Sequence, residues 1–287
     1  MSAPLPVIVG LPHGGLAAPG EMAGRIAITD TTIYNECDLW VHDLYDFAHP
    51  DLATANGGRP GPGVLATVEV PVGRVFVDTN RQPGDTGFDG AIKTGTSYGD
   101  PVYQDALTTD DRHLLHQRYW EPYHHALTAA FAAHAGEVRF FLDGHNMAQI
   151  TPKAYGYKGA HRPFVCLANL GDERGEISAH HGGVLSCSPA FLRRAGEIAA
   201  DLFGDLTLLE PVSGVKPPVV ALNWPFSGGY ILSRYTTSVP GIMVEINRGL
   251  FVGNQSTDTP ISPPNGNVIA AIRLRLFQWL TAILAEL

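Results

Sequence analysis

Three short segments of this sequence combine an apolar run with a titratable side chain at its end. They are LPHGG at residues 11–15, FLDGH at residues 141–145 and VEINR at residues 244–248. A short apolar run is typical of a buried β-strand, and open α/β sheets bind ligands at the ends of such strands. The sequence therefore predicts that His13, His145 and Glu245 meet at one edge of a sheet. Two imidazoles and a carboxylate in that position are typical of a zinc hydrolase site.

The length and the apolar content of the chain favour one large α/β domain. The 287 residues are 45% hydrophobic and only 16% charged, which supplies a substantial core and argues against a disordered chain. The sequence shows no internal repeat and no clear linker between domains. We therefore expect a single domain that spans residues 1–287.

The charge balance limits the partners that the chain can have. The net charge is −9 and the sequence contains no run of Lys or Arg, which argues against binding to nucleic acid or to an anionic membrane. A small anionic substrate is still compatible with this charge, because a single arginine can bind a carboxylate. Nothing in the sequence indicates an oligomeric state.

The cysteines and the two ends of the chain bear on its compartment. The sequence has 3 widely spaced cysteines without a CxxC pair, which is typical of a reducing compartment. The first residues show no signal-peptide pattern. The apolar stretch 268–287 is interrupted by Arg273, Arg275 and Glu286, so its helical stripe predicts a helix packed on a sheet and not a membrane span. We therefore expect a cytoplasmic protein.

Apolar periodicity and helix signals divide the chain into strands and helices. Strands are predicted at residues 6–10, 64–70, 75–78, 138–143, 163–169, 219–222 and 242–246. Helices are predicted at residues 35–47, 109–135, 189–203 and 268–287. Pro122 is expected to bend or break the second of these helices. The alternation predicts a mixed sheet with helices on both faces, together with a functional loop in the Gly- and Pro-rich stretch 79–100.

His13 and two nearby acids are candidate metal ligands. His13 follows Pro12 and precedes two glycines, which let the backbone turn sharply beside a ligand, although a loop histidine bonded to a carbonyl would look the same. Glu36 and Asp38 lie two residues apart, and zinc commonly takes one carboxylate beside two histidines. Helix capping is the alternative role for these acids. The sequence does not choose between the two carboxylates.

The other two strand ends offer a second ligand and a base. Asp143 precedes His145 and is placed to accept the hydrogen bond that fixes the tautomer of this imidazole. Glu245 follows the apolar residues 242–244, and an unpaired carboxylate buried there would have a raised pKa that suits a general base. A structural ion pair with Arg248 is the alternative for Glu245.

Asn80 and Arg81 are candidates for binding a substrate carboxylate. They follow the apolar run 75–77 and open the irregular stretch of the chain. The planar fork of an arginine holds a carboxylate through two parallel hydrogen bonds. An exposed arginine in a loop is the alternative interpretation.

Seven strings of the chain carry a family resemblance. They are LPHGG at 11–15, ECDLWVHDLYDF at 36–47, VDTNRQP at 77–83, RYWEPYHHAL at 118–127, FLDGHNM at 141–147, SGGYI at 227–231 and VEINRGLF at 244–251. In this order they resemble the N-formylglutamate amidohydrolase family, also called N-formylglutamate deformylases. The resemblance implies a fold similar to that of zinc-dependent exopeptidases of the carboxypeptidase type. It also implies one zinc ion at the carboxyl edge of a sheet that lies between helices.

The resemblance further implies a role for each candidate residue. His13 and His145 resemble the two zinc histidines, and either Glu36 or Asp38 resembles the third ligand. Asn80 and Arg81 resemble a carboxylate-binding pair, and Glu245 matches the general base. The resemblance also implies a loop that closes over the substrate, formed by Gly228, Gly229 and Tyr230.

The activity implied by the resemblance is the zinc-dependent cleavage of N-formyl-L-glutamate to formate and L-glutamate. The substrate would be a small N-acyl amino acid, and the usual setting of the family is histidine degradation. A carboxypeptidase or a deacylase that acts on other N-acyl amino acids or short peptides is the alternative enzyme. A small-molecule binding protein that keeps the fold without turnover is the alternative outside the enzymes.

Overall fold

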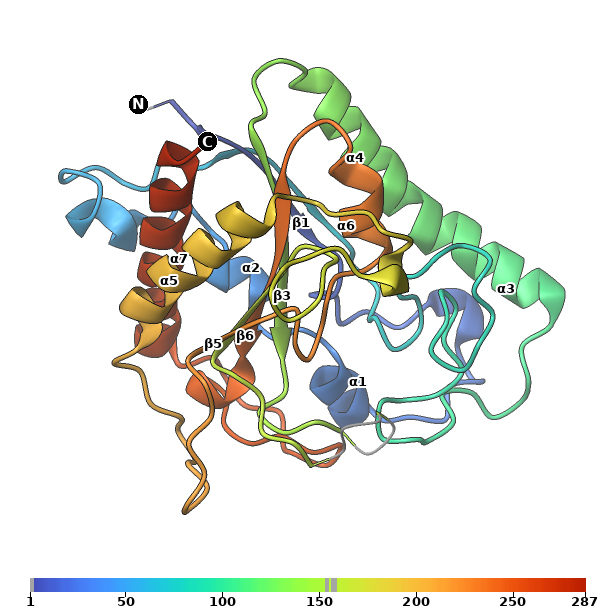
Figure 1. The fold of residues 1–287 in the computed structure, drawn as a ribbon. Helices are drawn as coiled ribbons and strands as arrows, with labels where there is room; N and C mark the ends of the chain where they lie inside the picture. The colour runs from blue at the N-terminus through green and yellow to red at the C-terminus, as the bar shows by residue number, and fades with distance from the viewer. Residues whose placement is uncertain (1–2, 153–154, 156–158) are drawn as a thin grey trace.

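The computed structural model describes residues 3–152, 155 and 159–287, and its centre is a six-stranded mixed sheet (Figure 1). The spatial order is β2-β1-β3-β6-β4-β5. Strands β2, β1, β3 and β6 run parallel, β4 is antiparallel to β6, and β5 is parallel to β4. The strands are β1 (Leu5–Leu11), β2 (Val64–Glu69), β3 (Phe140–Met147), β4 (Val165–Ala168), β5 (Val220–Leu222) and β6 (Gly241–Asn247). The predicted α/β class with a mixed sheet is confirmed.

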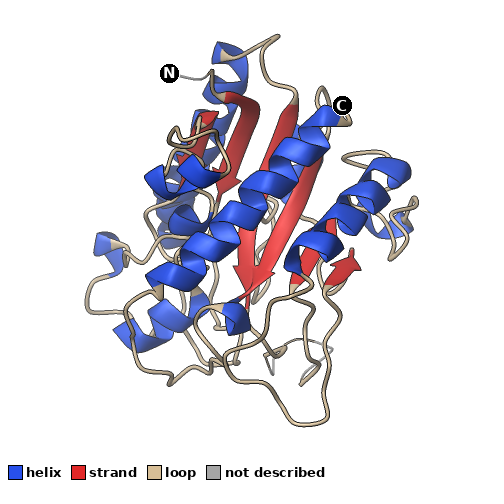
Figure 2. Ribbon diagram, turned by 90° about the vertical axis from the view of Figure 1, so that its left-hand side faces the viewer, coloured by secondary structure: helices blue, strands red, loops and turns tan. Residues whose placement is uncertain are grey.

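Helices cover both faces of this sheet (Figure 2). Helices α2, α5 and α7 contribute to the apolar core on one face, and α1, α3, α4 and α6 contribute to the core on the other face. The helices are α1 (Asp30–Glu36), α2 (Val41–Leu44), α3 (Thr109–Leu115), α4 (Glu121–Ala133), α5 (Pro189–Phe203), α6 (Tyr230–Tyr235) and α7 (Gly266–Ala285). Short 3₁₀ turns lie at Gly20–Met22, Pro50–Thr54, Ala179–His181 and Arg248–Leu250.

The alternation of side chains along each central strand explains the two cores. In β3, Phe140 and Leu142 are buried on the side of α5 and α7, and Phe141 is buried on the opposite side. Because both faces are covered, all residues of β3 and β6 are buried. The carboxyl ends of the parallel strands are therefore the place where polar side chains of these strands can reach a ligand.

Helix α7 is the C-terminal helix that the sequence predicts against a sheet. It buries a stripe that includes Ile272, Leu276 and Leu280 in the core that it shares with α2 and α5. Within the described residues it is the one helix that is long and apolar enough to cross a membrane, but 50% of that apolar window is buried inside the protein. This burial is what a core helix shows.

The predicted helix over residues 35–47 is wrong, because the chain forms two short helices there. Helix α1 ends at Glu36, and α2 begins at Val41. Trp40 between them has a left-handed backbone with φ of 56°, and the backbone N–H of Asp38 donates to the carbonyl of His13 at 2.9 Å. The break ties the segment that carries Asp38 to the loop that carries His13.

The predicted strand over residues 75–78 is also wrong. The backbone turns there, since the N–H groups of Phe76 and Val77 both donate to the carbonyl of Gly73, at 2.9 and 3.3 Å. Val75, Phe76 and Val77 are all fully buried in the core on the side of α4. Burial accounts for this apolar run without any strand, because short apolar runs do not by themselves distinguish a strand from another buried segment.

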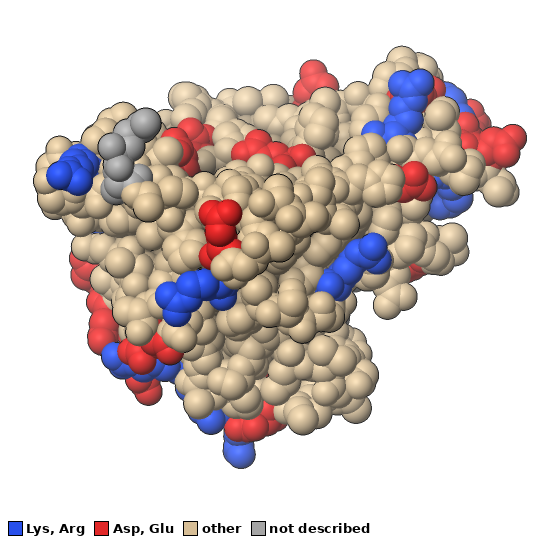
Figure 3. Space-filling model, turned by 90° about the horizontal axis from the view of Figure 1, so that it is seen from above, with Lys and Arg blue, Asp and Glu red and all other residues tan. Residues whose placement is uncertain are grey.

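The predicted helix over residues 109–135 is observed as a continuous helical segment from Thr109 to Ala133, and Pro122 does not break it. Helix α3 passes into a π-helical turn at His116–Trp120, and α4 then begins with Pro122 in its first turn. Directly before Pro122, the backbone N–H of Glu121 donates to the carbonyl of His116, five residues back, which is the hydrogen-bond pattern of a π-helical turn. The face seen from above in Figure 3 shows basic side chains scattered among acidic ones, without a broad basic patch on that face.

Candidate active site

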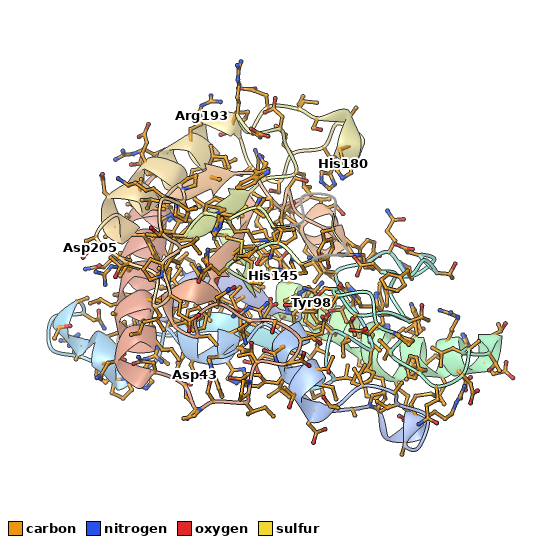
Figure 4. The ribbon with its side chains drawn as sticks, turned by 90° about the horizontal axis from the view of Figure 1, so that it is seen from below. Asp43, Tyr98, His145, His180, Arg193 and Asp205 are labelled. Atoms are coloured by element: carbon orange, nitrogen blue, oxygen red, sulfur yellow. The ribbon has the colours of Figure 1, made fainter. Side chains whose placement is uncertain are left out.

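The structure brings the three titratable strand ends together at the carboxyl edge of the parallel strands. His13 lies just beyond β1, His145 lies near the end of β3, and Glu245 lies opposite His145 in the register of β3 and β6. All three line one pocket, and Figure 4 shows His145 beside Tyr98 near the centre of the molecule when this edge is viewed. His145 lies inside the strand, because β3 runs to Met147 and not to residue 143 as predicted.

His13, Asp38 and His145 form a buried group that could hold a metal ion. The Nδ1 atoms of the two imidazoles are 3.1 Å apart. One carboxylate oxygen of Asp38, Oδ2, lies 3.2 Å from Nδ1 of His145 and 3.6 Å from Nδ1 of His13. The three side chains are nearly inaccessible to solvent, and their ligand atoms all lie within 4.8 Å of one another.

Two further carboxylates orient the imidazoles. Nε2 of His13 is 2.8 Å from Oδ1 of Asp78, and Nε2 of His145 is 3.0 Å from Oδ1 of Asp143. A carboxylate only accepts hydrogen bonds, so each neutral ring carries its proton on Nε2 and presents the lone pair of Nδ1 to the shared centre. The contact between Asp143 and His145 that the sequence predicts is present, whereas Asp78 is a partner that the sequence analysis missed.

This arrangement fits a tetrahedral cation. Zinc with ligand bonds of about 2.0–2.2 Å separates neighbouring ligand atoms by about 3.3–3.6 Å, close to the separations found here. Two lone pairs that face each other in a buried site repel unless a cation or a proton lies between them. Burial lowers the pKa of His145, but Asp143 and Asp38 outweigh it and raise this pKa well above its usual range. The group is thus built to hold positive charge.

The structure separates the two acids between which the sequence did not choose. The carboxylate of Glu36 accepts hydrogen bonds from the backbone N–H of Ser97 at 3.0 Å and from the Ser97 hydroxyl at 2.5 Å. Asp38 lies with the histidines instead, because the chain leaves the helical path after Glu36. Burial alone would raise the pKa of Asp38, but the two histidines keep it well below its usual range.

Glu245 is a buried carboxylate beside the group of His13, Asp38 and His145. It is 7% exposed, and burial raises its pKa to about 7, against the opposing effect of His145. The alternative ion pair with Arg248 is not found among the described residues, since Nη1 of Arg248 donates to the backbone carbonyls of Asn35 and Cys37 at 3.2 and 2.8 Å. A carboxylate with such a pKa can both accept and return a proton near neutral pH.

Arg81 lines the same pocket but already has an acidic partner. Its Nη2 lies 2.8 Å from Oδ2 of Asp89, and its Nη1 lies 3.8 Å from Oδ2 of Asp78. Asp89 also pairs with the buried Lys93. Arg81 is therefore held in place by a charge network of the stretch 79–100, which the sequence analysis expected to be functional.

Asn80 connects the pocket to the segment around Gly229. Its Oδ1 accepts the backbone N–H of Ile231 at 3.0 Å, and a Cβ on Gly229 would lie 2.3 Å from that same oxygen. Only glycine allows this close approach. Gly228 lines the pocket of the histidines, whereas Gly229 and Tyr230 line an adjoining hollow that also contains Arg81.

Three arginines of the pocket were not identified as site residues from the sequence. Arg74, Arg162 and Arg248 all line the pocket. Arg162 precedes β4, and only the antiparallel direction of β4 brings its beginning to the edge where β3 and β6 end. The residues of a strand do not determine its direction in the sheet. The sequence could therefore show that a polar residue lies next to a predicted strand, but not at which edge of the sheet that residue lies.

Comparisons with known proteins identify the family and the fold of the chain. The sequence profile of the N-formylglutamate amidohydrolase family matches residues 5–252. A search of curated proteins found no match. Two solved structures are similar in fold: an N-formylglutamate amidohydrolase from Ralstonia eutropha JMP134, and a gene product of Agrobacterium tumefaciens.

The two structural similarities extend over nearly the whole chain. The Ralstonia enzyme is 18% identical, with a TM-score of 0.66 over 100% of this chain and 96% of its own. The Agrobacterium protein is 15% identical, with a TM-score of 0.64 over 98% of this chain and 90% of its own. At these identities the structures show the fold, and the family profile over most of the sequence shows the relationship. The chain belongs to the N-formylglutamate amidohydrolase family.

Proposed function

We propose that this protein is a zinc-dependent amidohydrolase that cleaves N-formyl-L-glutamate to formate and L-glutamate. The observation that carries the proposal is the buried group of His13, Asp38 and His145 beside Glu245 in one pocket. Membership of the family supports the amide substrate. Release of formate from N-formyl-L-glutamate by the purified protein tests the proposal, and a panel of N-acetyl and aminoacyl glutamates tests the alternative deacylase.

His13, Asp38 and His145 would hold the zinc ion, and three protein ligands are the number that catalytic zinc sites use. When bound, zinc supplies a Lewis acid that makes water more acidic and polarises a carbonyl group. Asp78 and Asp143 keep both imidazoles in the tautomer that presents Nδ1. The ligand set thus contains one carboxylate and two imidazoles, with further carboxylates behind the rings.

Glu245 would move the proton. Its carboxylate takes a proton from the water that attacks the formyl carbon and passes this proton to the leaving nitrogen of glutamate. The raised pKa of Glu245, about 7, results from its burial and matches the two-way transfer. Its position opposite His145 in the register places the carboxylate next to the metal ligands.

Asn80 and Arg81 would bind and orient the substrate. Arg81 offers a guanidinium group to a substrate carboxylate, and Asp89 holds that group at the pocket wall. Asn80 fixes the segment of Gly228, Gly229 and Tyr230 through its bond to the N–H of Ile231. A substrate held at its carboxylate presents the amide to the metal and the base in a defined orientation.

Replacing Arg81 with alanine should weaken catalysis on charged substrates selectively. We expect kcat/KM for N-formyl-L-glutamate to fall. The loss should correspond to on the order of 2–4 kcal/mol of transition-state binding, because a desolvated charge pair between Arg81 and the substrate is lost. Formamides without a carboxylate should lose much less. Kinetics on both substrate types with the wild-type and Arg81→Ala proteins measure the difference. Equal losses on the two types would count against the carboxylate-binding role.

Replacing Asp143 with asparagine should weaken metal binding without removing a metal ligand. The neutral amide no longer fixes the Nε2 proton of His145, so we expect zinc affinity to fall by about 10- to 100-fold. Competition with a chromophoric chelator measures the affinity. Unchanged affinity would show that Asp143 does not support the ligand.

We also propose a cytoplasmic setting and a role in histidine degradation. All three cysteines, Cys37, Cys166 and Cys187, are buried and free, which suits a reducing compartment. The role in histidine degradation follows from the resemblance to the family. A strain that lacks this chain and accumulates N-formylglutamate on histidine would support that role.

A further inference from the structure

The pocket wall contains four guanidinium groups, and they differ in how their charge is balanced. Nη2 of Arg74 lies 2.8 Å from Oδ2 of Asp78, and Nη2 of Arg81 lies 2.8 Å from Oδ2 of Asp89. These two arginines are therefore neutralised by carboxylates of their own segment. Of the other two, Arg162 precedes β4 and Arg248 follows β6, so both lie on the other side of His145 along the sheet.

Arg162 and Arg248 are buried without a carboxylate partner in the described part of the chain. Arg162 is 4% exposed; its Nε donates to Oγ1 of Thr151 at 3.3 Å, and its guanidinium lies 4.8 Å from the ring centroid of Phe226. Arg248 is 7% exposed; its Nη1 donates to two backbone carbonyls, and its buried Nε has no described partner. The seven residues outside the description include no Asp or Glu in the sequence.

The sheet places these two arginines side by side. Val165 of β4 pairs with Ile246 of β6 in antiparallel register, so the residues before β4 lie next to the residues after β6. The side chain of Asn247 fastens the two segments, since its Nδ2 donates to the carbonyls of Arg162 and Pro163 at 3.1 and 2.9 Å. The backbone positions from which both side chains extend are therefore set by the sheet.

Two adjacent buried cations are unfavourable unless an anion accompanies them. Burial lowers the pKa of Arg162 to about 10, against the opposing effect of Glu245 and with a smaller effect of Arg248 in the direction of burial, so Arg162 still carries its charge at neutral pH. Glu245 lines the same pocket, but no ion pair joins its carboxylate to either arginine among the described residues. An anionic group of a ligand would balance the positive charge of Arg162 and Arg248 on this side of the pocket.

We propose that Arg162 and Arg248 form a second carboxylate subsite, which selects N-acyl amino acids that carry two carboxylates. This inference rests on the proposed function and deepens it. Arg81 binds one carboxylate of the substrate, and the Arg162–Arg248 pair binds the other. Arg162 and Arg248 are thus specificity-determining residues that the family resemblance did not assign.

Three substrates test the proposal on the zinc-loaded full chain. N-formyl-L-glutamate has both carboxylates, N-formyl-L-glutamine lacks the side-chain charge, and 4-formamidobutyrate lacks the α-carboxylate. We expect Arg162→Gln to lower the preference in kcat/KM for N-formyl-L-glutamate over one of the two monocarboxylates by at least about tenfold, since loss of a buried charge pair costs this much or more. The affected compound identifies the carboxylate that lies at the subsite. Preferences that stay unchanged would overturn the proposal.

Matched variants separate specificity from damage to the fold. Arg162→Lys should recover part of the preference, and Arg59→Gln, at an exposed arginine, should leave both preferences unchanged. Because Arg162→Gln also removes a hydrogen bond to Thr151 and a cation–π contact with Phe226, the melting temperature of each variant is measured beside its kinetics to confirm that the protein is folded. A variant that loses activity equally on all three substrates would point to a structural role and would overturn the proposal.

A binding measurement separates this inference from the proposed function. If the wild-type protein releases formate from none of the three compounds, the proposed function fails. Calorimetry with glutarate and butyrate then tests the subsite alone. We expect glutarate to bind at least about tenfold more tightly than butyrate to the wild type, and this difference to shrink in Arg162→Gln. Equal binding of the two acids by the wild type would overturn the subsite.

Discussion

Replacing Glu245 with glutamine should lower kcat by about 10²- to 10⁴-fold, the usual contribution of a general acid–base group. Glutamine has the shape of the glutamate side chain but cannot take a proton from water near neutral pH. The carboxylate of Glu245 lies opposite His145 in the sheet and has a pKa of about 7 through burial, so we expect it to carry the proton in both directions. Steady-state formate release from N-formyl-L-glutamate measures the loss.

The zinc content of the Glu245→Gln protein is the control for this experiment. Glu245 lies outside the group formed by His13, Asp38 and His145, so the variant should bind as much zinc as the wild type. The same loss of kcat together with loss of zinc would show that Glu245 acts as a ligand. A kcat within a few-fold of the wild-type value would show that another group moves the proton.

Replacing Asp38 with asparagine should weaken zinc binding by more than the roughly 10- to 100-fold that loss of an outer hydrogen-bond partner costs. The carboxylate of Asp38 approaches Nδ1 of both histidines, at 3.2 and 3.6 Å, and it supplies the negative charge of the ligand set. Formate release should fall in parallel with bound zinc. Titration of the metal-free protein against a chromophoric chelator measures the affinity.

Glu36→Gln is the matched substitution at the neighbouring acid. The carboxylate of Glu36 accepts hydrogen bonds from Ser97, and a glutamine oxygen can still accept them, so zinc affinity should stay near the wild-type value. The reverse result, in which Glu36→Gln loses zinc and Asp38→Asn keeps it, would contradict the ligand set proposed here. The pair of variants therefore resolves the choice that the sequence left open.

The central strands and their terminal residues could be predicted from the sequence. Each of β1, β3 and β6 contains a short apolar run, and each has a titratable residue within it or at most two residues after it. In a parallel sheet such residues meet at one edge, so the convergence of His13, His145 and Glu245 follows from strand patterns alone. The structure extends β3 to Met147, but this difference does not move His145 away from that edge.

The local path of the chain between the strands could not be predicted. Asp38 and Glu36 differ in role because the helix ends at Glu36 and a left-handed residue, Trp40, follows. That break depends on a backbone bond between Asp38 and His13, which are distant in sequence. Likewise, the apolar run 75–77 is buried in a turn, because the surrounding core and not its own pattern decides its conformation.

The arginines of the pocket are a further feature that the sequence alone could not predict in full. Arg81 lines the pocket, but its partner Asp89 comes from a stretch without periodicity. Arg162 reaches the pocket only because β4 runs against β6. Strand direction and side-chain pairing across the sheet arise from tertiary packing, so a reading of single segments gives neither.

The central claim is that a metal ion held by His13, Asp38 and His145 is required for deformylation. Metal content and formate release from N-formyl-L-glutamate should be measured on one preparation, before and after removal of the metal by a chelator and again after zinc is restored. We predict zinc bound in a one-to-one ratio, formate release that disappears with the metal, and recovery when zinc returns. Full formate release by the metal-free protein, or none by the zinc-loaded protein, would contradict the claim.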